Sequence, residues 1–379
     1  MKTKLQCFFI GLALLAVVHP ALAQQRLSIV PAGNQALLFW PATATNYVLQ
    51  STTNLVSPNW GPVNDAVPVT INNTIIVIVS YTSPAMFFRL YYNTTAPAGM
   101  ALIPAGAFTI GDTLDGEGDA TPTNVVYVSA FYMDVDLVTS NEWQTVYTYA
   151  ANHGYSFDDT GNGNASNQPV WLVDWYDMVK WCNARSQQAG LMPAYYTDTN
   201  LTQVYTNTDV DAVYVNWSAN GYRLPTEAEW EKAARGGLSG QRFPWGDLIS
   251  ETNANYNSGG GYTYDLGPAG YNTNFDTQAS GVYTSPVGFF AANGYGLYDM
   301  AGNVSERCWD WYAGPPYPTG SPYLGGTDPH GPASSPYGYR VFRGGNWAYG
   351  ANYLRCAARF YQAPDYASSV IGFRCVRGL

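Results

Sequence analysis

The sequence predicts an α+β protein in two parts, a small all-β sandwich module followed by a larger, loop-rich domain with few helices. Two observations lead to this prediction. Residues 27–93 alternate short β-branched and aromatic runs with Asn, Pro, Gly and Ser, a pattern typical of short strands. Beyond residue 99, three helix signals stand among long segments rich in Gly, Asn and Tyr, which indicates an α+β domain.

The first 23 residues have the composition of a secretory signal peptide. Lys2 and Lys4 precede an apolar run at 7–18, and Ala21-Leu22-Ala23 provides the small residues of a cleavage site. We therefore expect export to the periplasm, the cell surface or the medium. No later apolar run reaches the roughly 18 residues of a spanning helix, so we expect no membrane span in the mature chain.

The β-sandwich module is expected at residues 27–93, with strands at 35–40, 47–50, 74–80 and 85–92. No helical period of useful length interrupts these runs, so an antiparallel sandwich accounts for them. Residues 94–99, Thr-Thr-Ala-Pro-Ala-Gly, form the predicted linker, and residues 100–379 form the second domain.

Capping signals predict where the helices of the second domain begin. Thr139 and Glu142 form a capping box ahead of one helix, and Thr226 and Glu229 form a capping box ahead of another. A further helix is expected within residues 171–190. The rest of the domain is predicted to be loops and short strands, which need staples such as disulfides and bound ions.

The composition excludes some partners and favours others. The formal net charge of −10 repels phosphate backbones, so we expect no nucleic-acid partner. The 31 Tyr and 12 Trp residues offer large contact areas at low entropic cost, which favours a peptide ligand, a glycan ligand or a cell-surface partner.

Other residue constellations predict no catalytic centre. After signal cleavage His153 and His330 are the remaining histidines, too few for a three-histidine iron centre, and no Gly-x-Ser-x-Gly elbow exists. The acidic segments at 112–119 and 158–164 do not have EF-hand spacing. We expect both segments to be solvated loops.

Six motifs of the second domain occur in one order: GYRLPTEAEWE at 221–231, FPWG at 243–246, NGYGLYDMAGNV at 293–304, RGGNW at 343–347, RCAAR at 355–359 and IGFRC at 371–375. Residues 100–111 add an opening pair of strands. Over about residues 98–379 the chain resembles the formylglycine-generating-enzyme (sulfatase-modifying-factor) family. The resemblance implies a loop-rich α+β fold related to C-type lectins.

The chain departs from the catalytic members of this family at one segment. In those members, two cysteines between the Gly-Gly turn and the Cys-Ala-Ala-Arg motif bind copper(I) and support oxidation of a substrate cysteine to formylglycine. Here residues 346–354 contain no cysteine, and Tyr349 stands at about the position of the first ligand. Copper(I) requires soft sulfur ligands, so we expect a member that lacks the catalytic cysteine pair and copper-dependent catalysis.

Four cysteines remain after signal cleavage: Cys182, Cys308, Cys356 and Cys375. An even number in an exported chain favours two disulfides, for which three connectivities exist. The resemblance implies a bridge between Cys182 and Cys375. It also places Ala234 where the family has the partner of Cys356, which leaves Cys308 as the candidate partner.

The resemblance implies calcium as a cofactor. The side chains of Asp299 and Glu306 and the main chain at Gly302 and Val304 would hold the ion, because calcium prefers hard oxygen ligands. The alternative is a solvated turn in which Glu306 pairs with Arg307 or another base.

A second implied calcium site uses Asn255 and the carbonyl of Tyr256, with Asp276 as a candidate acid. Elsewhere, Arg343 and Arg359 are expected to form buried or bridging ion pairs.

Together these observations predict a secreted, calcium-stabilised module that binds a peptide or glycan through Asn346, Trp347 and Tyr349. One alternative is a formylglycine-generating-type oxidase or another oxidative protein-modifying enzyme with altered chemistry. Another alternative is an architectural cell-surface protein that attaches through its N-terminal module.

Overall fold

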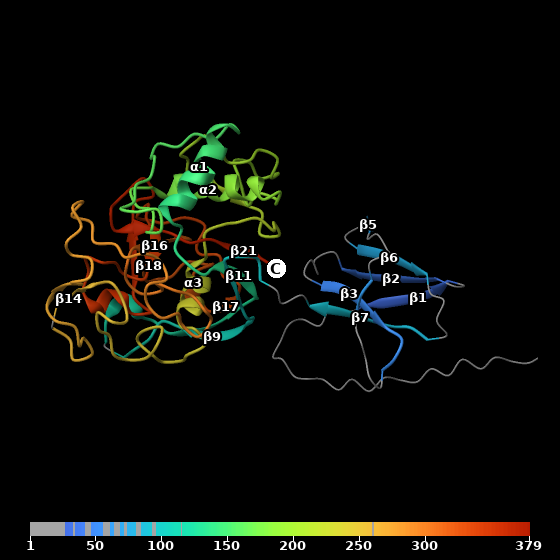
Figure 1. Cartoon of the computed structure of the whole chain (residues 1–379), viewed down its shortest axis with the longest axis horizontal. Coiled ribbons are helices and arrows are strands. Elements are labelled where there is room, and N and C mark those ends of the chain that lie inside the picture. The colour runs from blue at the N-terminus through green and yellow to red at the C-terminus, as the bar shows by residue number, and fades with distance from the viewer. Residues whose placement is uncertain are drawn as a thin grey trace, which may run out of the picture.

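The structure is a computed structural model that describes residues 27–32, 35–41, 47–55, 61–63, 69–71, 74–80, 85–92, 96–114, 116–259 and 261–379. The predicted signal peptide and the first two residues of the predicted linker lie outside these described residues. Figure 1 shows two groups of elements: strands β1 to β7 lie together, and the three helices lie with strands β8 to β21.

The N-terminal group consists of two antiparallel sheets. One sheet has the order β1-β2-β6-β5 and the other β4-β3-β7. The bounds are β1 Ser28–Ala32, β2 Gln35–Pro41, β3 Tyr47–Thr52, β4 Gly61–Pro62, β5 Val69–Ile71, β6 Thr74–Ser80 and β7 Phe87–Tyr92. Leu38 and Val77 of the first sheet share one buried core with Leu49 of the second, so the two sheets form the predicted sandwich.

The second domain opens with two three-stranded sheets. Their orders are β17-β10-β9 and β21-β11-β8. The bounds are β8 Met100–Ile103, β9 Gly106–Ile110, β10 Asn124–Val128, β11 Phe131–Asp134, β17 Gly326–Thr327 and β21 Val376–Gly378. Both strands predicted within 100–111 are present, but they belong to different sheets, since β8 pairs with β11 and β9 pairs with β10.

Three helices occur in the described part of the chain, and two of them begin at the predicted capping boxes. Their bounds are α1 Ser140–Ala151, α2 Trp175–Gln188 and α3 Glu227–Ala234. The Thr139 and Thr226 hydroxyls accept hydrogen bonds from the backbone N–H groups of Glu142 and Glu229. These bonds satisfy N-terminal donors that the helices themselves leave unpaired.

The helices occupy different environments, as Figure 1 shows: α1 and α2 lie side by side, whereas α3 lies among the strands. The rings of Trp143 on α1 and Trp181 on α2 stack with centroids 5.9 Å apart and join the two helices in one core. Every residue of α3 is buried. This helix therefore connects the opening sheets with the main sheet.

The main sheet has the order β19-β18-β16-β20. Its strands are β16 Ser305–Trp311, β18 Arg340–Arg343, β19 Arg359–Gln362 and β20 Ile371–Gly372. The remaining elements are β12 Tyr195–Tyr196, β13 Tyr214–Val215, β14 Asn257–Ser258, β15 Gly270–Tyr271 and the 3₁₀ turns η1 Gly118–Ala120, η2 Pro322–Leu324 and η3 Ala351–Leu354. The domain is thus α+β and loop-rich, as predicted.

Buried ion pairs tie the main sheet to α3. Arg343 of β18 pairs with Glu231, and Arg359 of β19 donates two hydrogen bonds of 2.9 Å to Glu227. The two predicted arginine ion pairs are therefore present. Removing one member of such a pair leaves an uncompensated buried charge, which costs about 3–5 kcal/mol.

No helix among the described residues is long and apolar enough to cross a membrane.

Candidate functional site

The segment 346–354 joins β18 to β19 and begins at a tight glycine turn. Gly344 and Gly345 both have positive φ values, 90° and 65°. A Cβ atom on Gly345 would lie 2.7 Å from Leu354 Cδ1 and 2.9 Å from the Tyr353 carbonyl oxygen. Glycine therefore allows the turn to pack against η3, which fixes both ends of the segment.

The first predicted ligand residue, Asn346, is completely buried. Its side-chain amide donates to Ser305 Oγ at 3.0 Å and its side-chain oxygen accepts from the backbone N–H of Ala348 at 3.0 Å. Asn346 therefore holds the turn to β16, and a ligand contact of this buried side chain stays a prediction.

The second predicted ligand residue, Trp347, packs inward. Only 7% of the residue is exposed, and its ring centroid lies 5.2 Å from Tyr283 and 5.7 Å from Tyr271. Its indole N–H donates to the Ser369 carbonyl at 3.3 Å. Trp347 therefore anchors the segment to the residues that it packs against.

The third predicted ligand residue, Tyr349, lies at the surface with 38% of the residue exposed. It starts a row of aromatic rings, called here the aromatic row, in which successive centroids lie 4.8 Å, 5.0 Å and 5.8 Å apart. The row consists of Tyr349, Tyr353, Phe360 and Phe342. Burial, and then Tyr353 and Tyr366, raise the pKa of Tyr349, so its hydroxyl stays protonated at neutral pH.

A second aromatic group lies beside the next position of β19. Tyr361 stacks on Tyr312 with centroids 3.8 Å apart and lies 5.4 Å from Tyr339. Successive residues of a strand point to opposite faces, so Tyr361 and Phe360 belong to different faces of the sheet. Tyr337, 55% exposed and 5.9 Å from Tyr312, completes this second group.

The carboxylates of the first implied calcium site have different partners. Both oxygens of Glu306 accept hydrogen bonds from Arg374, at 2.7 Å and 3.0 Å, and both residues are fully buried. Asp299 accepts one hydrogen bond from Gly288 N at 2.8 Å, while its Oδ1 has no hydrogen-bond partner in the described part of the chain. The implied set therefore does not fit a cation as a unit, because Glu306 is already neutralised.

The main chain of this segment packs against the second implied site. A Cβ atom on Gly302 would lie 2.4 Å from the Asn255 carbonyl oxygen, and Val304 is also buried. The Asn255 amide donates to the Tyr283 carbonyl at 2.7 Å. The Asn255 side chain therefore links its own loop to the loop that contains Tyr283.

Asp265 contacts the side chain of Tyr256, while Asp276 as an acid of the second implied site stays a prediction. The Tyr256 hydroxyl donates to Asp265 Oδ1 at 2.6 Å. Burial, together with this hydrogen bond to a carboxylate, raises the pKa of Tyr256. An ion bound to the Tyr256 carbonyl stays a prediction.

The four described cysteines are buried free thiols. Cys182 Sγ lies 3.6 Å from Cys375 Sγ, while Cys308 and Cys356 lie in one core with α3. The structure thus contains neither predicted disulfide as a formed bond. The Cys182–Cys375 bridge stays a prediction that needs only a small sulfur displacement.

These thiols do not fit a copper(I) site. Burial raises the pKa of Cys308 and Cys375, and it raises the pKa of Cys356 to about 12. Copper(I) binds thiolates, and segment 346–354 contains no cysteine.

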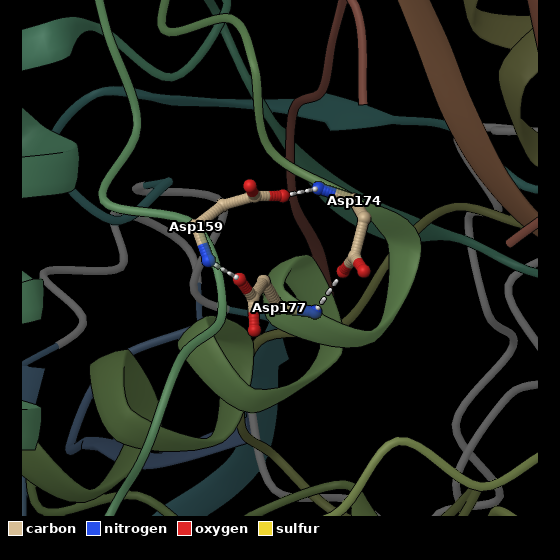
Figure 2. Close-up of side chains that lie close together, drawn as sticks. All are labelled: Asp159, Asp174 and Asp177. Atoms are coloured by element: carbon tan, nitrogen blue, oxygen red, sulfur yellow. Dashed lines mark hydrogen bonds between the residues drawn. The ribbon is translucent and has the colours of Figure 1, made fainter. Parts of the chain in front are cut away.

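One group of three side chains with metal-binding chemistry was missed from the sequence. Among the described residues, Asp159, Asp174 and Asp177 bring carboxylate oxygens within 4.8 Å of one another. Figure 2 shows the cycle they form: the Asp159 carboxylate accepts from Asp174 N, Asp174 accepts from Asp177 N, and Asp177 accepts from Asp159 N. Asp159 is therefore part of a folded cluster, where the sequence predicts a solvated loop.

This aspartate cluster already contains a cation. Lys180 Nζ lies 2.7 Å from Asp177 Oδ1 and 2.7 Å from Asp209 Oδ1. Burial is the main cause that raises the pKa of Asp159, Asp174 and Asp177, and the pKa of Asp174 reaches about 7. The backbone bonds and Lys180 give the cluster a structural role at the start of α2.

Comparison with known proteins gives a consistent result. The model of the sulfatase-modifying factor enzyme 1-like domain matches residues 90–379. The formylglycine-generating enzyme of Streptomyces coelicolor is 32% identical over 303 residues, which cover 73% of this chain and 88% of that protein. The chaperone protein LppX of Paenibacillus barcinonensis is 31% identical over 267 residues, which cover 69% of this chain and 82% of that protein.

Among solved structures, Treponema denticola variable protein 1 superposes with a TM-score of 0.56 at 27% identity. The match covers 84% of this chain and 100% of that chain.

Proposed function

Because the chain belongs to the sulfatase-modifying factor enzyme 1-like family, we propose a function within that family: recognition of a polypeptide without copper-dependent oxidation. The surface that contacts the polypeptide is centred on Tyr349, the exposed first ring of the aromatic row. This row replaces the predicted set of Asn346, Trp347 and Tyr349, of which only Tyr349 is exposed.

The observation that carries this proposal is the position of Tyr349. It stands in the segment where catalytic relatives carry copper ligands, and here the segment presents a protonated phenol instead. Its ring packs against Tyr353, which in turn packs against Phe360, so little side-chain freedom remains to be lost on binding. Tyrosines held in this way are effective anchors at protein interfaces.

The choice of a polypeptide over a glycan is supported by the relatives. One is named for the formation of formylglycine, which is an amino-acid residue, and another is named a chaperone protein. Both names refer to polypeptides. We propose the same class of ligand for this chain.

Export is part of the proposal. The basic and apolar pattern of residues 1–23 supports it. Cell fractionation of the full-length chain tests this point, because accumulation of uncleaved protein inside the cell would contradict export.

A peptide selection tests the ligand-binding surface. Phage-displayed peptides are selected on the purified protein, and the affinity of each selected peptide is measured for wild type, Y349A and Y337A. Tyr337 is a matched control, because it is an exposed tyrosine of the second aromatic group. We expect Y349A to weaken binding at least tenfold, about 1.4 kcal/mol, and Y337A to leave it unchanged.

Two outcomes of this selection would reject the proposal. Equal affinities for wild type and Y349A would remove the aromatic row from the binding surface. Binding on a glycan array, with no peptide enriched by the selection, would replace the polypeptide with a sugar ligand.

A further inference from the structure

A cavity of about 360 Å³ lies where the C-terminal end of α3 meets β9 and β10. Lys232 of α3 lines it, together with Arg235 and Leu238 from the residues that follow the helix. Phe108 of β9 and Val125 of β10 line its other side. The volume is typical of pockets that bind small molecules. No residue of the aromatic row lines this cavity, so it is a separate place on the domain.

Lys232 brings a buried ammonium group to this cavity. Only 5% of the residue is exposed, and its Nζ donates to the Gly106 carbonyl at 2.9 Å and to the Val128 carbonyl at 3.0 Å. An ammonium has three N–H donors, so one of them has no acceptor within the described part of the chain. Buried charges are normally paired, as Lys180 is with Asp177 at 2.7 Å. Lys232 forms no such pair with a described carboxylate.

The lining of the cavity carries only positive charge. Lys232 and Arg235 belong to it and no acidic residue does, although the chain has 27 acidic and 17 basic residues. Arg235 is already paired, because its Nη2 donates to Glu231 Oε1 at 2.7 Å. The charge without a counter-ion at this cavity is therefore that of Lys232.

The walls beside this charge are largely apolar. Val125 is 60% exposed and Leu238 is 42% exposed, and Phe108 is half-buried between them and the core. The ring of Tyr295 also lines the cavity, and its Cε1 lies 3.5 Å from the position of a Cβ atom on Gly237. Such walls suit a ligand that combines an apolar body with a negatively charged group.

We propose that this cavity binds the carboxylate of a small apolar acid, with Lys232 as the charged partner of the carboxylate. The carboxylate accepts the third N–H of Lys232 in a charge-assisted hydrogen bond. The apolar body covers Val125 and Leu238, which removes exposed apolar surface from water. A free carboxylic acid and the C-terminus of a peptide that ends in an apolar residue share this chemistry, so the experiment includes both.

The charge of Lys232 makes binding depend on pH. Burial lowers the pKa of Lys232 to about 8, and Asp328 acts in the opposite direction. The charged groups around its Nζ are thus Asp328 and the already paired Arg235. Only the ammonium form attracts a carboxylate, so affinity falls as the pH rises through about 8. The ammonium fraction at pH 9 is about one tenth of that at pH 7, so we expect a Kd about tenfold higher.

Calorimetric titration of the purified full chain tests the site. The probes are hexanoate, its neutral analogue hexanamide, and the peptide acetyl-Gly-Gly-Leu with a free or an amidated C-terminus. We expect at least one of the two carboxylates to bind, and its uncharged counterpart to bind at least tenfold more weakly. Tighter binding of hexanoate identifies a free acid as the ligand, and tighter binding of the peptide identifies a chain terminus.

Two variants with the same change make the result specific. L238E places a carboxylate at the cavity wall and should weaken binding at least tenfold. L248E makes the same change at an exposed leucine outside the lining and should bind as wild type does. K232M should abolish binding. If K232M does not fold, L238E and the pH series still decide, because Leu238 is exposed and its replacement leaves the contacts of Lys232 in place.

Three results would overturn the proposal: no binding of either carboxylate at millimolar concentration, equal binding of hexanoate and hexanamide, or wild-type affinity in L238E. Each would leave Lys232 with a structural role alone, as the link between α3 and the carbonyls of Gly106 and Val128.

Discussion

Asp174 links pH to stability in a way that can be measured. Its carboxylate caps α2 by accepting from Asp177 N at 2.8 Å, inside the aspartate cluster of Figure 2. Burial, and then the carboxylates of Asp177, Asp159 and Asp209, raise its pKa from 3.8 to about 7. The folded protein therefore binds this proton more tightly than the unfolded chain does.

The sign and size of the effect follow from this difference. The contribution of Asp174 to the free energy of unfolding is largest below the pKa that this carboxyl has in the unfolded chain. It falls as the pH rises toward the pKa of about 7 that the carboxyl has in the folded protein. Each pKa unit is worth about 1.4 kcal/mol, so the ionised carboxylate costs up to about 4 kcal/mol above pH 7. D174N removes the charge and keeps a side chain that caps helices well. We expect D174N to match wild type near pH 4 and to exceed it by up to about 4 kcal/mol at pH 8.

Urea unfolding followed by tryptophan fluorescence provides the assay, at several pH values for wild type, D174N and D158N. Asp158 is exposed, so D158N controls for the change in net charge. The informative quantity is the difference in unfolding free energy between variant and wild type, because other groups that titrate cancel. A difference that does not change with pH, or a D174N variant that is less stable at pH 8, would refute the reasoning.

Two further predictions concern the interior. E231Q removes the partner of both Arg343 and Arg235 and should lower the free energy of unfolding by about 3–5 kcal/mol. The control is E142Q, which changes a glutamate in an exposed capping box. A loss below about 1 kcal/mol in E231Q would contradict a buried ion network. Cys182 and Cys375, with sulfurs 3.6 Å apart, should be recovered as one linked peptide pair from unreduced, exported protein by mass spectrometry; free Cys182 and Cys375 in that digest would show that the thiols stay reduced.

The features that the sequence predicts well depend on neighbours along the chain. The capping boxes at Thr139 and Thr226 each need a glutamate three residues later, and the helices begin there. The strands of the N-terminal sandwich likewise follow from runs of β-branched and aromatic residues. The capping contacts lie within one short segment, and the strand runs carry their β preference locally even though their partners are distant, as in the pairing of β2 with β6.

The features that it misses depend on contacts between distant segments. Glu306 and Arg374 are 68 residues apart, and their ion pair removes Glu306 from the implied calcium set. The aspartate cluster joins Asp159 to the start of α2, 15 residues later in the chain. The sequence immediately around Asp159 gives no sign that this residue contacts the start of α2 and does not lie in a solvated loop. The burial of Asn346 likewise depends on Ser305, which lies on another strand.

Segment 346–354 shows how such contacts leave room for the proposed recognition role. Its first turn is fixed by Gly345 and Asn346, and its end is fixed by Arg355, which donates to Glu117 at 2.5 Å and to Asp119 at 2.9 Å. Because these anchors lie outside residues 348–353, the exposed Tyr349 can change without removing any of them. Under the proposed function, stability and recognition are carried by different residues of this segment, so Y349A should fold as wild type does and its binding defect should report on the ligand alone.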